Sequence, residues 1–191
     1  MPSTLRQVLA AARVLLVLAL VLGVAYPLVV LGVGRLVPAE ADGSLLTVDG
    51  RVVGSTLIGQ QFTGDGWFLP RPSAAGDGYD PLASGGSNLG PNDPGLLATV
   101  TQRREQVAAQ EGVDVGQVPA DAVTASASGL DPDISPQYAR LQVDRVARTR
   151  GLDPAAVRAL VEAHVRGRVL GFLGAPHVNV LELNAALAAL G

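Results

Sequence analysis

Residues 14–34 read VLLVLALVLGVAYPLVVLGVG and contain no charged side chain, with Arg13 and Arg35 as the flanking residues. As an α-helix rising about 1.5 Å per residue, this stretch is about 31 Å long, which matches the roughly 30 Å hydrocarbon core of a bilayer. The sequence therefore predicts one transmembrane helix over residues 14–34. Pro27 predicts a local distortion near the far end, because proline cannot donate a backbone hydrogen bond.

The charges that flank the helix predict its orientation. Residues 1–13 hold Arg6, Arg13 and the amino terminus but no acidic residue, whereas the other flank has acidic residues soon after Arg35. Positive charge tends to stay on the cytoplasmic side of a membrane. We therefore expect a single-pass protein of the cell membrane with a cytoplasmic N-terminus and an extracytoplasmic domain over residues 35–191.

A cleaved signal peptide is the alternative interpretation of the same stretch. Ala39-Glu40-Ala41 resembles the small-residue pattern at which signal peptides are cut. The uncharged run is longer than the usual apolar region of roughly 7–15 residues in a signal peptide. This length favours a retained anchor, and both interpretations export the domain.

The composition excludes several kinds of chemistry. All 14 basic residues are arginine, and the chain has no cysteine. Without lysine there is no Walker A loop and no Schiff-base amine. Without cysteine there is no thiol nucleophile, thiolate zinc site or disulfide. The net charge of −3 argues against nucleic-acid binding, which depends on basic residues that neutralise phosphates.

The exported part begins with strand patterns. Residues 45–48 and 51–53 are extended apolar segments on either side of Asp49-Gly50, which favours a type I′ turn and therefore a β-hairpin. Residues 67–69 are a third extended piece. Strand patterns followed by helices predict a small mixed α+β domain.

Three helices are predicted by the same device, a capping side chain followed by proline at the first helical position. The pairs are Asp93-Pro94, Ser135-Pro136 and Asp153-Pro154. The first helix runs to about residue 110, with Leu97, Val100 and Val107 on one side. The second runs to about residue 150 and is expected to bury Ala139, Val143, Val146 and Ala147. A short strand over residues 178–180 and a helix over residues 183–190 complete the predicted elements.

No catalytic residue and no metal site is predicted. The chain has two histidines, His164 and His177, and neither lies in a metal-binding motif. His164 falls on an apolar helix face, as a buried structural histidine does, and His177 is expected at the surface. A membrane-tethered hydrolase is a weak alternative, because no G-x-S-x-G elbow is present.

A long segment over residues 73–95 is rich in Gly, Pro, Ser, Asn and Asp, a composition typical of a loop. A loop this long is functional or disordered, and we expect a functional one. Its glycine N–H groups and serine hydroxyls can cradle a phosphate or a carboxylate. A tight structural turn is the alternative interpretation of the same residues, and the favoured one. The candidates are Ser84, Gly85, Gly86, Ser87 and Asn88.

A second polar segment lies at residues 126–131, and its hydroxyls and carboxylate can cap a chain turn. Arg71 stands between two prolines, and an arginine held so stiffly can anchor a carboxylate through two hydrogen bonds. We expect Arg71 to pair with Asp131. The predicted site for a nucleotide, another anion or a partner is completed by Arg71, Ser73, Ser126, Ser128, Gly129 and Asp131.

In order along the chain, the motifs after the membrane helix are GSTLIGQ (54–60), RPSA (71–74), SGGSNL (84–89), VTASASGLD (123–131), ISP (134–136) and VNVLELN (178–184). With this spacing the chain resembles the C subunit of the Kdp-type potassium-transporting P-type ATPases. The resemblance extends over almost the whole chain. Each motif is weak alone, and their order makes the resemblance specific.

The resemblance implies a non-catalytic subunit of a four-subunit pump for high-affinity potassium uptake. Its partners would be a channel-like potassium-translocating subunit, an ATP-hydrolysing P-type subunit and a small single-helix subunit. The family is described as a catalytic chaperone that raises the ATP affinity of the hydrolysing subunit. No cofactor would be stably bound, and ATP would be met only in a transient ternary complex.

The expected orientation conflicts with direct ATP contact, since the hydrolysing domains of a P-type pump are cytoplasmic. Two interpretations therefore stay open. The domain either stabilises assembly and shapes the ion entrance from the outer face, or it senses nucleotide through residues 84–88 and 126–131.

Overall fold

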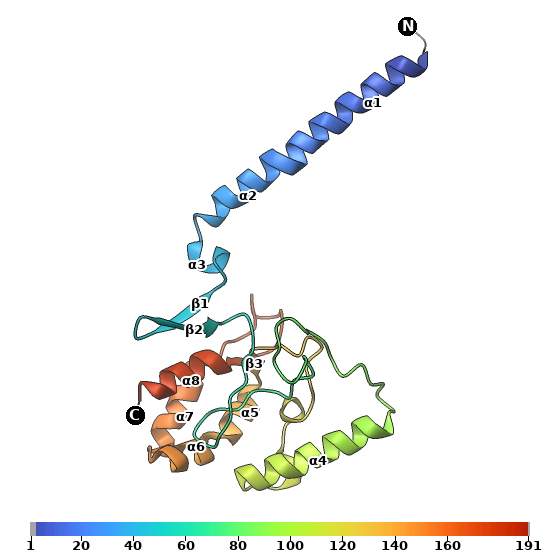
Figure 1. Ribbon diagram of the computed structural model, residues 1–191. Helices are drawn as coiled ribbons and strands as arrows, with labels where there is room; N and C mark the ends of the chain where they lie inside the picture. Colours follow the sequence, from blue (N-terminus) through green and yellow to red (C-terminus); the bar gives the residue numbers. More distant parts are fainter. Residues whose placement is uncertain (1–2, 191) are drawn as a thin grey trace. The chain divides into compact units, whose positions relative to one another are not determined.

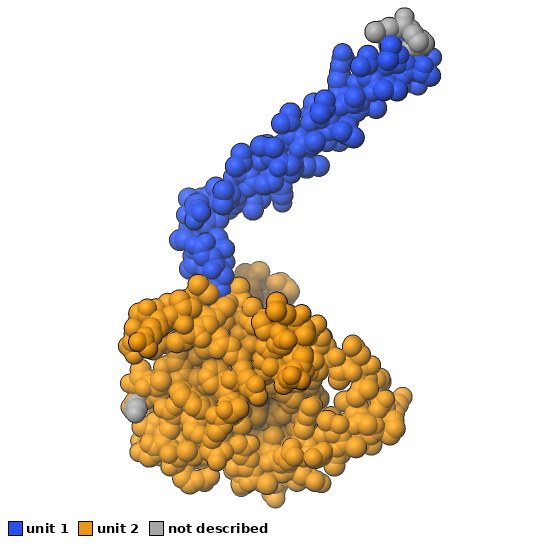
Figure 2. Space-filling view, in the orientation of Figure 1, with its two compact units in different colours: residues 1–44 blue, residues 45–191 orange. Residues whose placement is uncertain are grey.

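The computed structural model describes residues 3–190 and divides the chain into two compact units, residues 1–44 and residues 45–191. Figure 2 colours the two units separately. The predicted α+β class is confirmed, because a long apolar helix is followed by a domain of mixed helices and strands.

The first unit is almost entirely helical. Helix α1 (Ser3–Leu20), the π-helical turn η1 (Val21–Ala25) and helix α2 (Tyr26–Gly34) are continuous, and a short helix α3 (Pro38–Ala41) follows. Among the described residues, the helix Ser3–Gly34 is the one whose length and composition suit a membrane span. It begins well before residue 14, because the preceding residues also favour helix.

The distortion expected at Pro27 takes the form of the π turn that precedes it. The Tyr26 N–H donates to the Val21 carbonyl, five residues back, instead of four. A wider turn places the proline ring away from the preceding carbonyl groups, with which it would collide in a regular helix.

The second unit opens with the predicted hairpin. Strands β1 (Leu45–Val48) and β2 (Arg51–Ser55) are antiparallel, and Asp49 and Gly50 both have positive φ, as a type I′ turn requires. Strand β2 continues past residue 53, and the register shifts between Leu46 and Thr47.

Residues 56–93 contain no helix or strand. The extended piece predicted at residues 67–69 therefore forms no strand. Its backbone groups instead form hydrogen bonds with two buried side-chain amides, which take the place of a neighbouring strand. Asn184 accepts from the Phe68 N–H and donates to the Phe68 carbonyl, and Gln142 does the same for Leu69.

The remaining elements follow in order along the chain (Figure 1). They are α4 (Pro94–Glu111), η2 (Val115–Gln117), η3 (Ala120–Ala122), β3 (Asp133–Ile134), α5 (Pro136–Leu141), α6 (Val143–Arg150), α7 (Pro154–Ala163), β4 (Val178–Asn179) and α8 (Val180–Ala188). Strands β3 and β4 are antiparallel. The three predicted caps are confirmed, since the side chains of Asp93, Ser135 and Asp153 each accept a backbone N–H of the helix that follows.

The helix predicted from residue 136 to residue 150 is divided at Gln142 into α5 and α6. Gln142 is fully buried, and its amide binds the backbone of Leu69. The sequence pattern does not reveal this break, because the need for it comes from a segment more than seventy residues away. The last helix also starts earlier than predicted, at Val180, with Asn179 as its cap.

The core lies between α5, α6, α7, α8 and the residues around Phe68. The predicted stripe of Ala139, Val143, Val146 and Ala147 is fully buried. On the predicted apolar side of α4, Val100 and Val107 pack partly buried against the core, whereas Leu97 is 69 % exposed. Among the described residues of helix α4, only Ala108 and Glu111 are buried.

Candidate functional site

The two polar segments singled out in the sequence lie against each other. The Ser84 hydroxyl and the Gly85 N–H both donate to the Ser128 carbonyl, each at 2.9 Å. The segment at 84–88 thus meets the segment at 126–131 through its backbone. The tertiary structure brings together two groups of candidates that are about forty residues apart in sequence.

Gly129 permits this close approach. Its φ is +68°, and a Cβ at this position would lie 2.7 Å from the Ala75 Cβ and 2.7 Å from the Gly85 carbonyl oxygen. A Cβ on Gly86 would similarly lie 3.1 Å from the Ala127 carbonyl oxygen. The glycines here serve backbone packing between two loops, which favours a structural role for them.

The predicted pair of Arg71 and Asp131 is present. The Arg71 Nη1 lies 2.6 Å from the Asp131 Oδ2, and both side chains are only partly exposed. The other terminal nitrogen of Arg71 donates to the Thr124 carbonyl at 3.4 Å, and the Asp131 Oδ1 accepts from the Asp133 N–H. The pair therefore ties the loop at residue 71 to the turn that leads into β3.

Ser73 joins three parts of the same loops. Its hydroxyl donates to the Gly129 carbonyl at 2.7 Å and accepts from the N–H groups of Ala75 and Tyr79. The Tyr79 hydroxyl donates to the Arg71 carbonyl at 2.6 Å. Burial raises the pKa of Tyr79, and the nearby Asp131 carboxylate adds to the effect. This tyrosine is therefore a neutral hydrogen-bond donor at physiological pH.

These contacts bear on the two interpretations of residues 84–88. An anion cradle needs N–H and hydroxyl donors that face a ligand. Here the donors of Ser84 and Gly85 face a carbonyl of the same chain. Ser87 and Asn88 are exposed, whereas Ser126 is buried. The geometry favours the tight structural turn, and a ligand-binding role for the segment stays a prediction.

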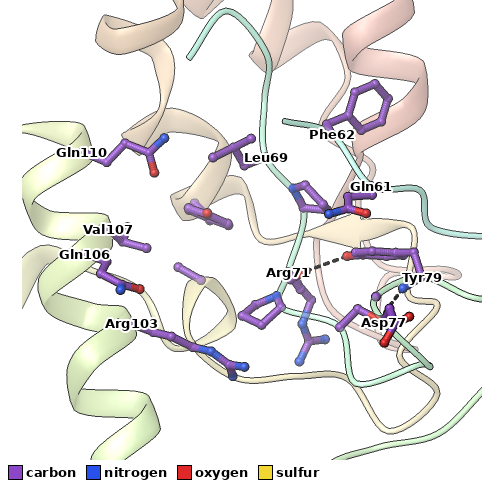
Figure 3. Close-up of a pocket in the computed structure, with 16 residues that line it drawn as sticks. Gln61, Phe62, Leu69, Arg71, Asp77, Tyr79, Arg103, Gln106, Val107 and Gln110 are labelled. Carbon is purple, nitrogen blue, oxygen red and sulfur yellow. Dashed lines mark hydrogen bonds between the residues drawn. The ribbon is translucent and has the colours of Figure 1, made fainter. Parts of the chain in front are cut away.

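A cavity of about 370 Å³, lined by both polar and apolar side chains, lies between the loop at residues 69–79 and α4. Figure 3 shows Arg103, Gln106 and Gln110 projecting from α4, with Arg71 and Tyr79 on the facing loop. Sequence reasoning missed the α4 residues. Their spacing of three and four residues places them on one helix face, a signal that was available in the sequence.

Arg71 borders two further hollows besides this cavity. One, of about 440 Å³, is lined by Asp121, Asp131, Asp133 and His177. The other is lined by residues of the segment at 125–132. Of the predicted site residues, Ser73, Ser126, Ser128 and Asp131 line hollows that Arg71 also borders, whereas residues 84–88 line none of these three hollows.

The histidines take the positions of structural residues. His164 ends α7, and its Nδ1 lies 2.8 Å from the Leu160 carbonyl oxygen. His177 is half-buried, with its Nε2 at 3.7 Å from the Asp133 Oδ2, so the expectation of a plain surface residue is too simple. In residues 3–190 no group of three histidine, aspartate or glutamate side chains is placed to hold a metal ion.

A buried ion pair was also missed by sequence reasoning. Arg145 and Glu111 are 2 % and 1 % exposed, and the Arg145 Nε lies 2.9 Å from the Glu111 Oε1. Arg145 also donates to the carbonyls of Asp65 and Trp67 and to the Gln142 side chain. Nothing in the helix pattern of α6 distinguishes this arginine from the exposed ones beside it.

A chain with one apolar span and a small α+β domain, whose polar site is largely satisfied by its own backbone, has the features of a membrane-anchored accessory subunit. The family described as "K+-transporting ATPase, c chain" (KdpC) matches residues 8–189. The chain therefore belongs to the KdpC family of potassium-transporting ATPase subunits.

Relatives of this family match over nearly their whole lengths. A KdpC subunit of Kineococcus radiotolerans is 60 % identical over 97 % of this chain and 94 % of its own. A KdpC subunit of Gemmatimonas aurantiaca is 56 % identical over 91 % of this chain and 87 % of its own. One from Geobacter sulfurreducens is 49 % identical over 97 % of this chain and 99 % of its own.

Proposed function

We propose that this chain is a non-catalytic subunit that holds a potassium-transporting ATPase complex together through its anchor helix and its α+β domain. The observation that carries the proposal is the engagement of Ser84 and Gly85 with the Ser128 carbonyl. The two loops that suggest a ligand cradle are joined to each other by hydrogen bonds, an arrangement that suits a rigid docking module. Family membership supports the same role.

The expected partners are the channel-like potassium-translocating subunit, the ATP-hydrolysing P-type subunit and a small single-helix subunit. With the N-terminus in the cytoplasm, the domain lies on the outer face, beside the ion entrance. Asp121 and Asp133 line the hollow near His177, where Asp131 is already paired with Arg71. At physiological salt the screening length is about 8 Å, so these carboxylates affect cations only if they border the pore.

Co-purification tests the assembly role. The complex is isolated through a tag on the hydrolysing subunit, from cells that carry the full chain, residues 1–44 alone, or no chain. We expect full recovery of the other subunits only with the full chain. Equal recovery without the chain would contradict the proposal, as would ATP hydrolysis by the purified chain alone.

A second candidate is the chaperone role, in which the domain raises the ATP affinity of the hydrolysing subunit. The cavity beside α4 supports it, because Arg71 and Arg103 border a space of about 370 Å³, a size typical of small-molecule sites. We expect Arg103→Gln to raise the KM of the complex for ATP without reducing its recovery. Glu105→Gln, an exposed position of the same helix that does not line the cavity, is the matched control.

The side of the membrane separates the two candidates. Protease added to intact cells should cut the domain if it lies outside, and should spare it if it lies in the cytoplasm. Cutting from outside supports the assembly role at the outer face, and protection supports direct contact with nucleotide.

A further inference from the structure

The segment between α7 and β4 forms an exposed apolar hairpin that none of the preceding functions uses. Its apolar tip, residues 169–173, is closed by two backbone hydrogen bonds between Val169 and Leu173, of 2.9 and 3.0 Å. The large side chains of the tip point into solvent. Val169 is 63 % exposed, Leu170 79 %, Phe172 68 % and Leu173 51 %.

The exposure belongs to an ordered structure and not to a loose loop. Below the tip, Arg166 and His177 exchange backbone hydrogen bonds of 2.9 and 3.0 Å, and Arg166 is paired with Glu182 of α8 at 2.6 Å. Leu170 has a φ of +53°, a conformation that costs energy for a residue with a side chain. The fold thus keeps these apolar side chains exposed although the backbone conformation of Leu170 costs conformational energy.

Such clustering requires a physical explanation. Single exposed apolar residues are normal on a soluble surface, whereas contiguous ones mark a surface that meets an apolar partner. The apolar tip combines four of them within five residues.

The bilayer of the chain's own membrane is the partner that the observations favour. The apolar helix ends at Gly34, and residues 35–44 connect it to β1. Fully extended, this connection reaches at most about 36 Å, at 3.3–3.6 Å per residue. A tether of this length keeps the domain close to the membrane surface at high effective concentration.

The hairpin also lies near the part of the domain where the chain enters from this connection. Asn179, which follows the hairpin, donates to the carbonyl of Thr56, just after β2. The next residues, Leu57 and Ile58, are 62 % and 39 % exposed and add apolar surface there. Arg168 precedes the tip, at the position where a cation can meet lipid phosphates.

We propose that the apolar tip, residues 169–173, inserts into the interfacial layer of the membrane that holds the anchor helix, with Arg168 at the level of the headgroups. This contact limits the rotation of the domain about its tether. It holds for either orientation of the chain, since the tether keeps the domain at one surface of the same bilayer.

This chain has no cysteine, so a single introduced cysteine gives one labelling site within it. Leu170→Cys is labelled with an environment-sensitive fluorophore in the ATPase complex, and the complex is reconstituted in nanodiscs that contain anionic lipid. The matched control is Leu82→Cys, which is 95 % exposed on a different loop. In a second set of nanodiscs, part of the lipid is brominated, because bromine quenches the fluorophore only when the lipid contacts it.

The proposal predicts that brominated lipid removes most of the fluorescence at position 170 and leaves the signal at position 82 unchanged. Arg168→Gln should weaken the quenching in anionic nanodiscs. Equal, water-like signals at both positions would overturn the proposal. A label at position 170 that is shielded from water but not quenched by brominated lipid would also overturn the proposal. That result would assign the apolar tip to a protein interface.

Discussion

At the scale of single residues, two arginines make similar ion pairs in different surroundings. Arg71 pairs with Asp131 at 2.6 Å where both side chains are largely covered, and Arg140 pairs with Glu162 at 2.6 Å where both are nearly half exposed. Exposed pairs contribute little because water and salt screen them, whereas covered charge-assisted hydrogen bonds contribute more.

We expect Arg71→Ala to lower the free energy of unfolding by about 1.5–3 kcal/mol, since Asp131 loses its partner. Arg140→Ala should cost less than about 1 kcal/mol. Thermal and urea unfolding of the full chain in detergent measures both. Equal losses would show that Arg71 has no special role in joining the loops.

Two glycines with the same backbone conformation differ in their surroundings. Gly129 and Gly112 have φ values of +68° and +69°, but only Gly129 has atoms within 4 Å of an added Cβ. Gly112→Ala should therefore cost only the left-handed conformation, about 1–2 kcal/mol. Gly129→Ala should cost about 1–3 kcal/mol more, because Ala75 and Gly85 must move. The same unfolding measurements check this, and equal costs would contradict the close approach of the two loops.

The buried Glu111 predicts a dependence on pH. Burial raises its pKa above the ordinary 4.5, and Arg145 offsets this only in part. The folded domain therefore binds the proton more tightly than the unfolded chain does. Between pH 4.5 and the raised value, the contribution of this carboxyl to stability falls as pH rises.

The comparison with Glu111→Gln isolates this effect, because the amide does not titrate. We expect the unfolding free energy of the natural chain, relative to the variant, to decrease from about pH 4 to about pH 7. Urea unfolding at several pH values measures the difference. An increase with pH would mean that attraction to Arg145 outweighs desolvation.

At the scale of elements, side chains of helices replace a missing strand. Asn184 of α8 and Gln142, at the break between α5 and α6, bind the backbone of Phe68 and Leu69. Arg150 adds a hydrogen bond to the Gly66 carbonyl and stacks over the Trp67 ring at 4.1 Å. An irregular segment thereby becomes part of the core.

We expect Asn184→Leu to lower the free energy of unfolding by about 2–5 kcal/mol, since a buried N–H and a buried carbonyl both lose their partner. Gln110→Ala, which removes an exposed hydrogen bond to Asp65 of the same segment, should cost less than about 1 kcal/mol. Unfolding in urea compares the two, and a small loss for Asn184→Leu would show that water replaces the amide.

At the scale of the whole molecule, the buried apolar core belongs to the second unit. Among the described residues, every buried apolar side chain of the core lies between Phe68 and Leu187. The helix of the first unit buries none of its residues. The stability of the domain should therefore not depend on the anchor.

We expect the fragment of residues 45–191 to unfold cooperatively, with a Tm within a few degrees of the domain transition in the full chain. Circular dichroism of the fragment, compared with the full chain in detergent, measures this. A fragment without a cooperative transition would show that the first unit takes part in folding.

Local patterns predicted most of the regular elements. The hairpin turn at Asp49-Gly50 and the three caps before proline depend on neighbouring residues, and the structure confirms them. Helical spacing places Leu97 on one side with Val100 and Val107, but Leu97 is exposed, because spacing does not say which part of a helix meets the core.

The candidate site was predicted in part. Arg71 and Asp131 could be paired because prolines stiffen one and a turn presents the other, and the pair is present. Arg103 and the glutamines of α4 were missed, because a polar helix face is usually solvated and only the facing loop makes it a cavity wall.

The sequence by itself determined the apolar span, the three capped helix starts at residues 94, 136 and 154, and the family, since each depends on residues that are close together or on motifs in a fixed order. Only the tertiary structure decided that Ser84 and Gly85 donate their hydrogen bonds to the Ser128 carbonyl. It alone also decided that the helix is interrupted at Gln142 and that residues 169–173 are exposed. The physical reason is that a polar group or an apolar side chain is satisfied by whatever the fold places beside it, often a segment far away in the chain.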